Sequence, residues 1–315
     1  MNKIVIAADL GGTNLRIAAI NAGGDILQRG RRKTPRSNDS AAIVRAITEL
    51  TFELREKLDG ELKPAVFAAA VPGVLDSANG LVFHSPNLPE LDGSDFSSKL
   101  SESLGLPVVL ENDANAAAIG ENWLGSSRGL SSSVCITLGT GVGGGIMIDG
   151  RILSGADGSA GEVGHICVQP DGPPCGCGGR GCLEQYSSAS AIVRMSRELL
   201  AEYPDSSLAN IESLSSAAVF SAGTAGDAMA LEVFRRAGFY LGVVCASLIN
   251  LLNPEAIVIG GGAAAGWDLF IGETMSQIKQ RAFRRPAERV KIVRAVLGDD
   301  AGILGAARSA VNYLN

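Results

Sequence analysis

The chain has 315 residues, which at roughly 150 residues per domain suggests about two domains. Hydrophobic residues make up 46% of it and charged residues 19%, so a sizeable core can form and a disordered chain is excluded. Lys and Arg number 27 against 33 Asp and Glu, a net charge of −6. We therefore expect neither nucleic acid nor an anionic membrane surface as a partner.

The predicted elements alternate between short apolar strands and amphipathic helices. In chain order, strands are expected at 4–10, 15–20, 25–27, 65–71, 107–110, 133–138, 146–150 and 256–259, and helices at 40–58, 95–104, 113–123, 184–202, 227–252 and 301–314. A strand, a Gly/Thr turn and a second strand occur near residues 9–14 and again near 138–146. This recurrence indicates an internal duplication, with one unit in each half of the chain.

The first strand also bears on localisation. Its apolar run, residues 4–8, is too short for a secretory signal, and no stretch approaches the roughly 20 apolar residues of a membrane span. We therefore expect a cytoplasmic protein without membrane contact. In such a reducing compartment, clustered cysteines more often bind metal than form disulfides.

The two glycine-rich turns are the first candidates for a binding site. Gly139, Gly141 and Gly144 match the dinucleotide fingerprint, but that site needs a helix after the glycines, and here a strand pattern follows. The alternative to a dinucleotide site is a pair of hairpin turns whose backbone N–H groups hold phosphate oxygens. A single turn of this kind is better explained as a tight β-turn, whereas two similar turns favour phosphate binding.

Acidic residues accompany two of these elements. Asp9 precedes the first turn, where a carboxylate either holds Mg²⁺, directly or through water, or satisfies the turn itself. Asp113 opens a predicted helix, where an N-cap is the default role for Asp. Its functional alternative is a general base that removes a proton from a hydroxyl attacking phosphorus, with Asn112 bonding the same substrate.

A cysteine-rich segment gives the sharpest signal. His165, Cys175, Cys177 and Cys182 follow the spacing H-x9-C-x-C-x4-C, a Cys3His set for a closed tetrahedral Zn²⁺ site. Four protein ligands leave no position for water, so we interpret the zinc as structural. Outside this set, His84 is interpreted as a loop histidine, and three cysteines are interpreted as ordinary small core residues: Cys135, Cys167 and Cys245.

Two carboxylates flank this segment. Glu162 lies three residues before His165, and Glu184 lies two residues after Cys182. A metal that fixes the loop also fixes both carboxylates, which suit the adjacent hydroxyls of a sugar. The alternative is that they are solvated loop acids.

Together these motifs resemble, in order and over nearly the full length, the ROK family of sugar kinases and sugar-responsive repressors within the actin-like ATPase superfamily. The resemblance is carried by Asp9-Leu-Gly-Gly-Thr-Asn-Leu-Arg16, Glu111-Asn-Asp113, Leu138-Gly-Thr-Gly-Val-Gly-Gly-Gly145, Gly158-Ser-Ala-Gly-Glu-Val-Gly-His165 and Cys175-Gly-Cys-Gly-Gly-Arg-Gly-Cys-Leu-Glu184. Residues 260–262 resemble the family's adenosine-side loop.

The resemblance implies an α/β fold of the ribonuclease H type, with two domains around a cleft: residues 1–112 with the helix 301–315, and residues 113–300. It implies a catalytic base, Asp113, and sugar contacts from Gly73, Asn87, Asn112, Asp113, Glu162, His165 and Glu184. It implies that ATP with Mg²⁺ is held by Asp9, Gly11, Gly12, Thr13, Asn14, Gly139, Thr140, Gly141, Gly261 and Gly262, and that the chain forms a homodimer.

The expected activity is ATP-dependent phosphorylation of a hexose at its 6-hydroxyl, with glucose as the favoured substrate. Family repressors carry a helix-turn-helix ahead of the first phosphate motif, and here Asp9 already lies in that motif. Glu90-Leu91 departs from the Gly-Trp of many family glucokinases, which leaves N-acetylmannosamine, N-acetylglucosamine, fructose and allose as alternatives. A sugar sensor without catalysis is the alternative from another class of protein.

Overall fold

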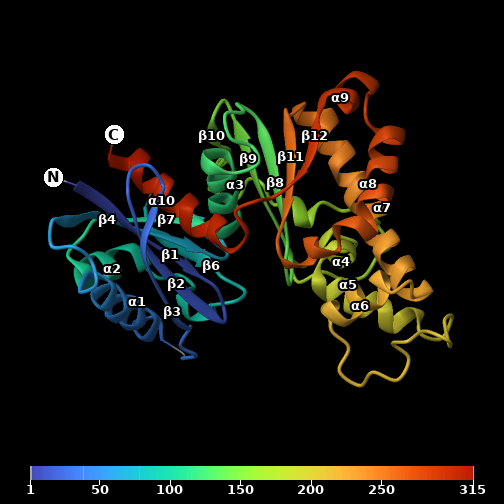
Figure 1. Ribbon diagram of the computed structural model, residues 1–315, viewed down its shortest axis with the longest axis horizontal. Helices are drawn as coiled ribbons and strands as arrows, with labels where there is room; N and C mark the ends of the chain where they lie inside the picture. The colour runs from blue at the N-terminus through green and yellow to red at the C-terminus, as the bar shows by residue number, and fades with distance from the viewer. Residues whose placement is uncertain (1, 38, 78, 315) are drawn as a thin grey trace. The chain divides into compact units, whose positions relative to one another are not determined.

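Two five-stranded sheets with the same strand order form the framework (Figure 1) in a computed structural model that describes residues 2–37, 39–77 and 79–314. The first sheet runs β3 (Ile26–Lys33), β2 (Asn14–Ile20), β1 (Asn2–Leu10), β4 (Leu62–Val71) and β7 (Val108–Asn112). The second runs β10 (Arg151–Ile152), β9 (Val142–Ile148), β8 (Ser133–Leu138), β11 (Ala256–Gly260) and β12 (Lys291–Arg294). This shared order confirms the predicted duplication and the α/β fold class.

The strand pairings follow the same pattern in both sheets. The chain enters each sheet by an antiparallel meander, and it adds the last two strands in parallel after helical crossovers. A short hairpin of β5 (Val74–Asp76) and β6 (Leu81–His84) follows β4. Parallel neighbours of this kind require crossover connections, which here are largely helical.

The helices agree only in part with the sequence. The structure contains α1 (Ser40–Arg55), α2 (Phe96–Leu104), α3 (Asp113–Leu124), α4 (Glu184–Ser187), α5 (Ala189–Leu199), α6 (Ser216–Thr224), α7 (Ala228–Leu252), α8 (Trp267–Arg281), α9 (Arg284–Arg289) and α10 (Ala301–Leu314). The helix predicted over 184–202 is divided at Ser188, whose side chain caps α5. Helices α6, α8 and α9 were not predicted. In α8 the buried face includes Thr274 and Gln277, which weaken its apolar periodicity.

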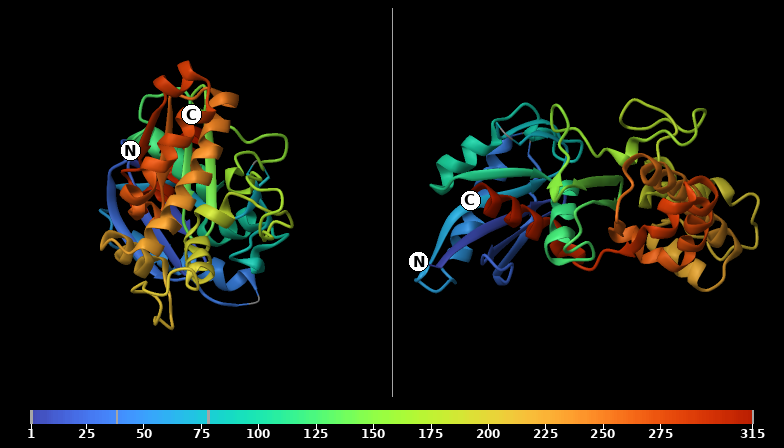
Figure 2. Two further views of the ribbon diagram at one scale, coloured as in Figure 1. Left: turned by 90° about the vertical axis from the view of Figure 1, so that its right-hand side faces the viewer. Right: turned by 90° about the horizontal axis from the view of Figure 1, so that it is seen from above.

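Helices cover both faces of the first sheet (Figures 1 and 2). On one face α1 and α2 pack against the strands through Ile43, Ile47, Phe96 and Leu100, all fully buried. On the other face the C-terminal helix α10, red in both figures, packs with α3 against β1, β2 and β4. The first sheet is therefore the centre of a three-layer arrangement.

Helices α3 and α10 approach each other closely because glycines lie where they cross. A Cβ added at Gly305 would lie 1.7 Å from the carbonyl oxygen of Ala116, and one added at Gly120 would lie 2.3 Å from that of Ala301. Both distances are far below van der Waals contact. The crossing therefore excludes any side chain at these two positions.

The chain divides into two compact units. Unit 1 comprises residues 1–131, 145–161 and 296–315, and unit 2 comprises residues 132–144 and 162–295. Unit 1 includes α10, in agreement with the predicted N-terminal domain. It also includes α3, which packs on α10 but lies beyond residue 112 in the prediction. The predicted boundary at residues 112 and 113 remains a proposal.

Helix α7 is the central helix of unit 2. It packs along α8, and it buries Phe234, Leu241 and Cys245 among others. Within the described residues it is the one helix long and apolar enough to cross a membrane, with half of its most apolar window buried inside the protein. The expectation that no stretch approaches the length of a membrane span was therefore too strict for this helix, whose apolar side chains serve the core.

Candidate active site

The first glycine-rich turn connects β1 and β2 in unit 1. The Gly11 N–H donates to the Asn14 carbonyl at 2.9 Å, and Thr34 fixes the turn from outside through its hydroxyl, which donates to the Gly11 carbonyl at 2.6 Å. A Cβ at Gly12 would lie 3.2 Å from the carbonyl oxygen of Asn87. The predicted phosphate turn therefore lies directly beside a predicted sugar contact.

Asp9 is the penultimate residue of β1, next to this turn, and is largely buried. Its Oδ2 lies 3.5 Å from Nη1 of Arg16, whose Nη2 also donates to Asp299 at 2.8 Å. Burial raises the pKa of Asp9 to about 6, against the lowering effect of Arg16 and with further raising by Asp113 and Asp299. The carboxylates of Asp9 and Asp113 are thus near enough to interact electrostatically.

Asn112, and not Asp113, caps helix α3. Asn112 has extended backbone angles, and its Oδ1 accepts hydrogen bonds from the Ala114 and Asn115 N–H groups at 2.9 and 3.0 Å. The capping role predicted for Asp113 was wrong, because Asp113 is already the first helical residue. This difference removes the main structural explanation for an acid at position 113.

The Asn112 amide also holds the neighbouring loop. Its Nδ2 donates to the Gly73 carbonyl at 2.9 Å. Gly73 has a φ of 115°, and a Cβ there would lie 2.1 Å from the carbonyl oxygen of His84. Four predicted sugar-contact residues, Gly73, Asn87, Asn112 and Asp113, therefore belong to one region of unit 1 next to the first turn.

Glu111 opens the Glu111-Asn-Asp113 motif, and the sequence alone predicts no role for it. Its Oε1 accepts from the Asn112 N–H and from Asn115 Nδ2, and its Oε2 accepts from the Ser309 hydroxyl of α10. Burial raises the pKa of Glu111. The side chain links the end of β7 to α10, a role that depends on long-range packing and leaves no local sequence signal.

The predicted zinc ligands converge in unit 2. The ligand atoms of His165, Cys175, Cys177 and Cys182 all lie within 4.8 Å of one another. Cys177 Sγ and Cys182 Sγ are 3.7 Å apart, and Cys175 Sγ lies 3.6 Å from His165 Nδ1. Tetrahedral Zn²⁺ with bonds of about 2.3 Å to S and about 2.0 Å to N requires separations of roughly 3.8 and 3.5 Å. The donor set therefore fits zinc in both chemistry and spacing.

The state of the six thiols and the second ring nitrogen of His165 also bear on this site. All six cysteines are free of disulfides. Cys135 and Cys245 are buried as expected, whereas Cys167 is exposed. The backbone of Cys167 pairs with that of Cys182 in an isolated antiparallel β-bridge. His165 Nε2 lies 3.9 Å from a Glu162 carboxylate oxygen. One ring nitrogen thus faces the thiols and the other faces a predicted sugar contact.

The second glycine-rich turn, between β8 and β9, lies beside this loop in unit 2. The Gly139 N–H donates to the Gly141 carbonyl at 2.9 Å, and the Val142 N–H donates to Glu184 Oε2 at 3.1 Å. A Cβ at Gly261 would lie 2.5 Å from the Leu138 carbonyl oxygen, so the predicted adenosine-side loop begins next to the turn. Strand β9 follows the turn, as predicted, and no helix stands where a dinucleotide fingerprint requires one.

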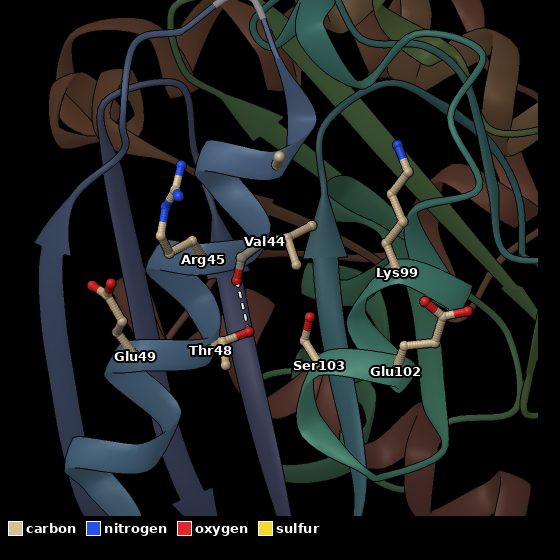
Figure 3. A pocket seen from close by; sticks show the side chains of 8 residues that line it. Val44, Arg45, Thr48, Glu49, Lys99, Glu102 and Ser103 are labelled. Atoms are coloured by element: carbon tan, nitrogen blue, oxygen red, sulfur yellow. Dashed lines mark hydrogen bonds between the residues drawn. The ribbon is translucent and has the colours of Figure 1, made fainter.

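A surface groove on unit 1 lies elsewhere. It has a volume of about 400 Å³ between α1 and α2, and it is lined by Ala41, Val44, Arg45, Thr48, Glu49, Lys99, Glu102 and Ser103 (Figure 3). The charged side chains from the two helices alternate in sign, and the Thr48 hydroxyl bonds the Val44 carbonyl at 2.8 Å. None of the predicted site residues lines this groove.

Comparison with known proteins identifies the family. The sequence model of the ROK family matches residues 5–312. A glucokinase from Halalkalibacterium halodurans is 38% identical, with 95% of this chain and 92% of the relative covered, and one from Thermotoga maritima is 37% identical, with 96% of each covered. The crystal structure of a ROK family glucokinase from Streptomyces griseus in complex with glucose and AMPPNP is 32% identical, with a TM-score of 0.84 over 98% of this chain and 99% of that one. The chain belongs to the ROK family and has its actin-like ATPase fold.

Proposed function

We propose that the protein is an ATP-dependent glucokinase that transfers the γ-phosphoryl group of ATP to the 6-hydroxyl of glucose. The observation that carries this proposal is the gathering, in unit 1, of a phosphate turn with Asn87, Asn112 and the carboxylate of Asp113. The names of its relatives, which are glucokinases at 37% and 38% identity, support glucose as the substrate.

In this proposal Asp113 is the general base. It accepts the proton of the 6-hydroxyl as that oxygen attacks the γ-phosphorus. Because Asn112 already caps α3, the carboxylate of Asp113 is not required for helix initiation. Sugar hydroxyls bind the backbone of Gly73 and the side chains of Asn87, Asn112, Glu162, His165 and Glu184.

The nucleotide is held by backbone N–H groups of the two glycine-rich turns, Gly11–Asn14 and Gly139–Gly141, and by Gly261 and Gly262. Asp9, buried beside the first turn, is the residue that would hold Mg²⁺, directly or through water. The ion would offset the charge on the phosphoryl oxygens. His165, Cys175, Cys177 and Cys182 would hold a structural zinc that fixes Glu162 and Glu184.

We further propose that the protein acts as a cytoplasmic homodimer, without nucleic acid or membrane as a partner, and that its two domains close on the sugar. Water competes with the sugar for the phosphoryl group, so exclusion of water from the site limits wasteful hydrolysis of ATP. Other hexoses remain as alternatives within the same mechanism.

The test is ADP release from Mg·ATP with glucose, N-acetylmannosamine, N-acetylglucosamine, fructose and allose. We expect a strong preference for glucose. A preference for another sugar would keep the mechanism and change the substrate. If the folded, zinc-loaded protein released no ADP with any of these sugars, the result would contradict the proposal and favour a sugar sensor.

A further inference from the structure

The turn at residues 139–142 is held by the segment that follows the cysteine-rich loop. The Ala189 N–H donates to the Gly139 carbonyl at 2.8 Å, and the Ser190 hydroxyl donates to the Thr140 carbonyl at 2.9 Å. The Val142 N–H donates to Glu184 Oε2. Three of the four residues of the turn thus have hydrogen-bond partners within residues 184–190, so the position of that segment sets the shape of the turn.

Glu184 also lies against the turn at Gly141. A Cβ added at Gly141 would lie 2.3 Å from Oε2 of Glu184. The carboxylate therefore lies directly against the turn backbone, and the absence of a side chain at 141 makes this contact possible. A hydrogen bond from a backbone N–H to a carboxylate is also stronger than one to a neutral acceptor.

Glu184 is at the same time fixed to the cysteine-rich loop. Its Oε1 lies 3.7 Å from Sγ of Cys175, and it follows Cys182 by two residues. The intervening Leu183 is held by its N–H, which donates to the Ile166 carbonyl at 2.9 Å, next to His165. Three of the four metal-ligand residues therefore lie beside Glu184, either in space or through a short stretch of hydrogen-bonded backbone.

We propose that Glu184 is a positioning residue for the nucleotide, which transmits the order of the metal loop to the phosphate turn at residues 139–142. Loss of the metal then weakens nucleotide binding even though the metal touches no phosphate. This inference rests on the proposed function for the assignment of the turn to the nucleotide. It gives Glu184 a role beyond the sugar contact predicted from the sequence.

The experiment measures binding of Mg·AMPPNP by titration calorimetry in the absence of sugar, so that sugar contacts do not contribute. We expect Glu184→Ala to raise the dissociation constant about tenfold, the effect of losing one hydrogen bond to a charged group. Asp171→Ala is the matched control, since Asp171 is an exposed carboxylate of the same loop that has no proposed role in binding. It should keep the wild-type dissociation constant.

A second series removes the metal with a chelator, with metal content and circular dichroism recorded for every sample. Chelation should weaken AMPPNP binding by the wild type. It should also weaken binding by Ser190→Ala, a variant that loosens the turn without touching the metal loop. In Glu184→Ala, chelation should cause no further rise in the dissociation constant. Wild-type affinity in Glu184→Ala, or affinity that follows metal content whatever residue stands at 184, would overturn the proposal. If the protein released no ADP with any of the sugars while AMPPNP binding followed the expected pattern, the proposed kinase activity would be refuted and the role of Glu184 would stand.

Discussion

At the scale of single residues, the division of labour between Asn112 and Asp113 leads to a direct test. Asp113→Ala removes the proposed base but leaves the cap, so turnover should fall by about 10²–10⁴ while the melting temperature stays near that of the wild type. A coupled ADP assay and calorimetry measure both. Asn112→Ala is the contrasting control, expected to cost about 1 kcal/mol of stability through loss of the cap. Near-normal turnover in Asp113→Ala would refute the assignment of the base.

Asp9 gives a prediction about pH. Its pKa is raised from 3.8 to about 6, so the folded state binds more protons than the unfolded state in that range. Stability therefore falls as pH rises from about 3.8 to 6, by at most about 3 kcal/mol. Asp9→Asn should be more stable than the wild type at pH 7 in urea unfolding without nucleotide or Mg²⁺. The two proteins should converge below pH 4, and an equal difference at both pH values would contradict this.

What the sequence could predict at this scale depended on how local each signal was. The four metal-ligand residues lie within an 18-residue stretch with a characteristic spacing, and their convergence was predicted in full. The capping of α3 was predicted one residue too late because Asn and Asp have similar preferences for the N-cap. The hydrogen bond between Glu111 and Ser309 joins residues that are 198 positions apart in the chain, and no local sequence pattern predicts it.

At the scale of elements, the crossing of α3 and α10 depends on glycine. Gly305→Ala should destabilise the protein by at least about 1–3 kcal/mol, because its methyl group would overlap the Ala116 carbonyl. Gly272→Ala in α8 is the matched control, since a Cβ there meets nothing within 4 Å. It should stabilise the protein by up to about 1 kcal/mol through helix propensity. Urea unfolding of both variants gives the sign, and a shared direction would contradict the packing argument.

The helices show why element prediction succeeded in some places and failed in others. Helix α1 has a continuous apolar face that includes Ile43, Ile47 and Leu54, so its existence followed from periodicity. Helix α8 buries polar side chains and leaves Met275 exposed, so its pattern is not that of an amphipathic helix. Its position depends on packing against α7, which periodicity within α8 does not encode.

At the scale of the whole molecule, the two units should respond differently to loss of the metal. Cys177→Ser should release zinc and raise the KM for sugar, because the loop carries Glu162 and Glu184. Backbone amides of the metal loop and of residues 184–190 should exchange hydrogen faster, whereas those of β1 and β4 in unit 1 should not. Equal acceleration in both units would show that the metal supports the whole fold, and an unchanged KM would refute the coupling to sugar binding.

Unit 1 is assembled from three separate stretches of chain, and its second hydrophobic cluster includes Ile303, Leu304 and Ala307 of α10. A fragment of residues 1–131 therefore lacks the helix that covers one face of its sheet. We expect this fragment to stay unfolded or to aggregate, and added residues 296–315 to restore its circular dichroism. A fragment that folded cooperatively alone would contradict the importance of α10.

The position of α10 also has a consequence for biosynthesis. A ribosome releases the strands of the first sheet early, but it translates α10 only after all of unit 2 has been made. Until then, the face formed by Val5, Ala7 and Ala18 lacks its covering helix. The nascent chain thus presents an apolar surface throughout most of its synthesis, a period in which chaperones can bind it and neighbouring nascent chains can associate with it.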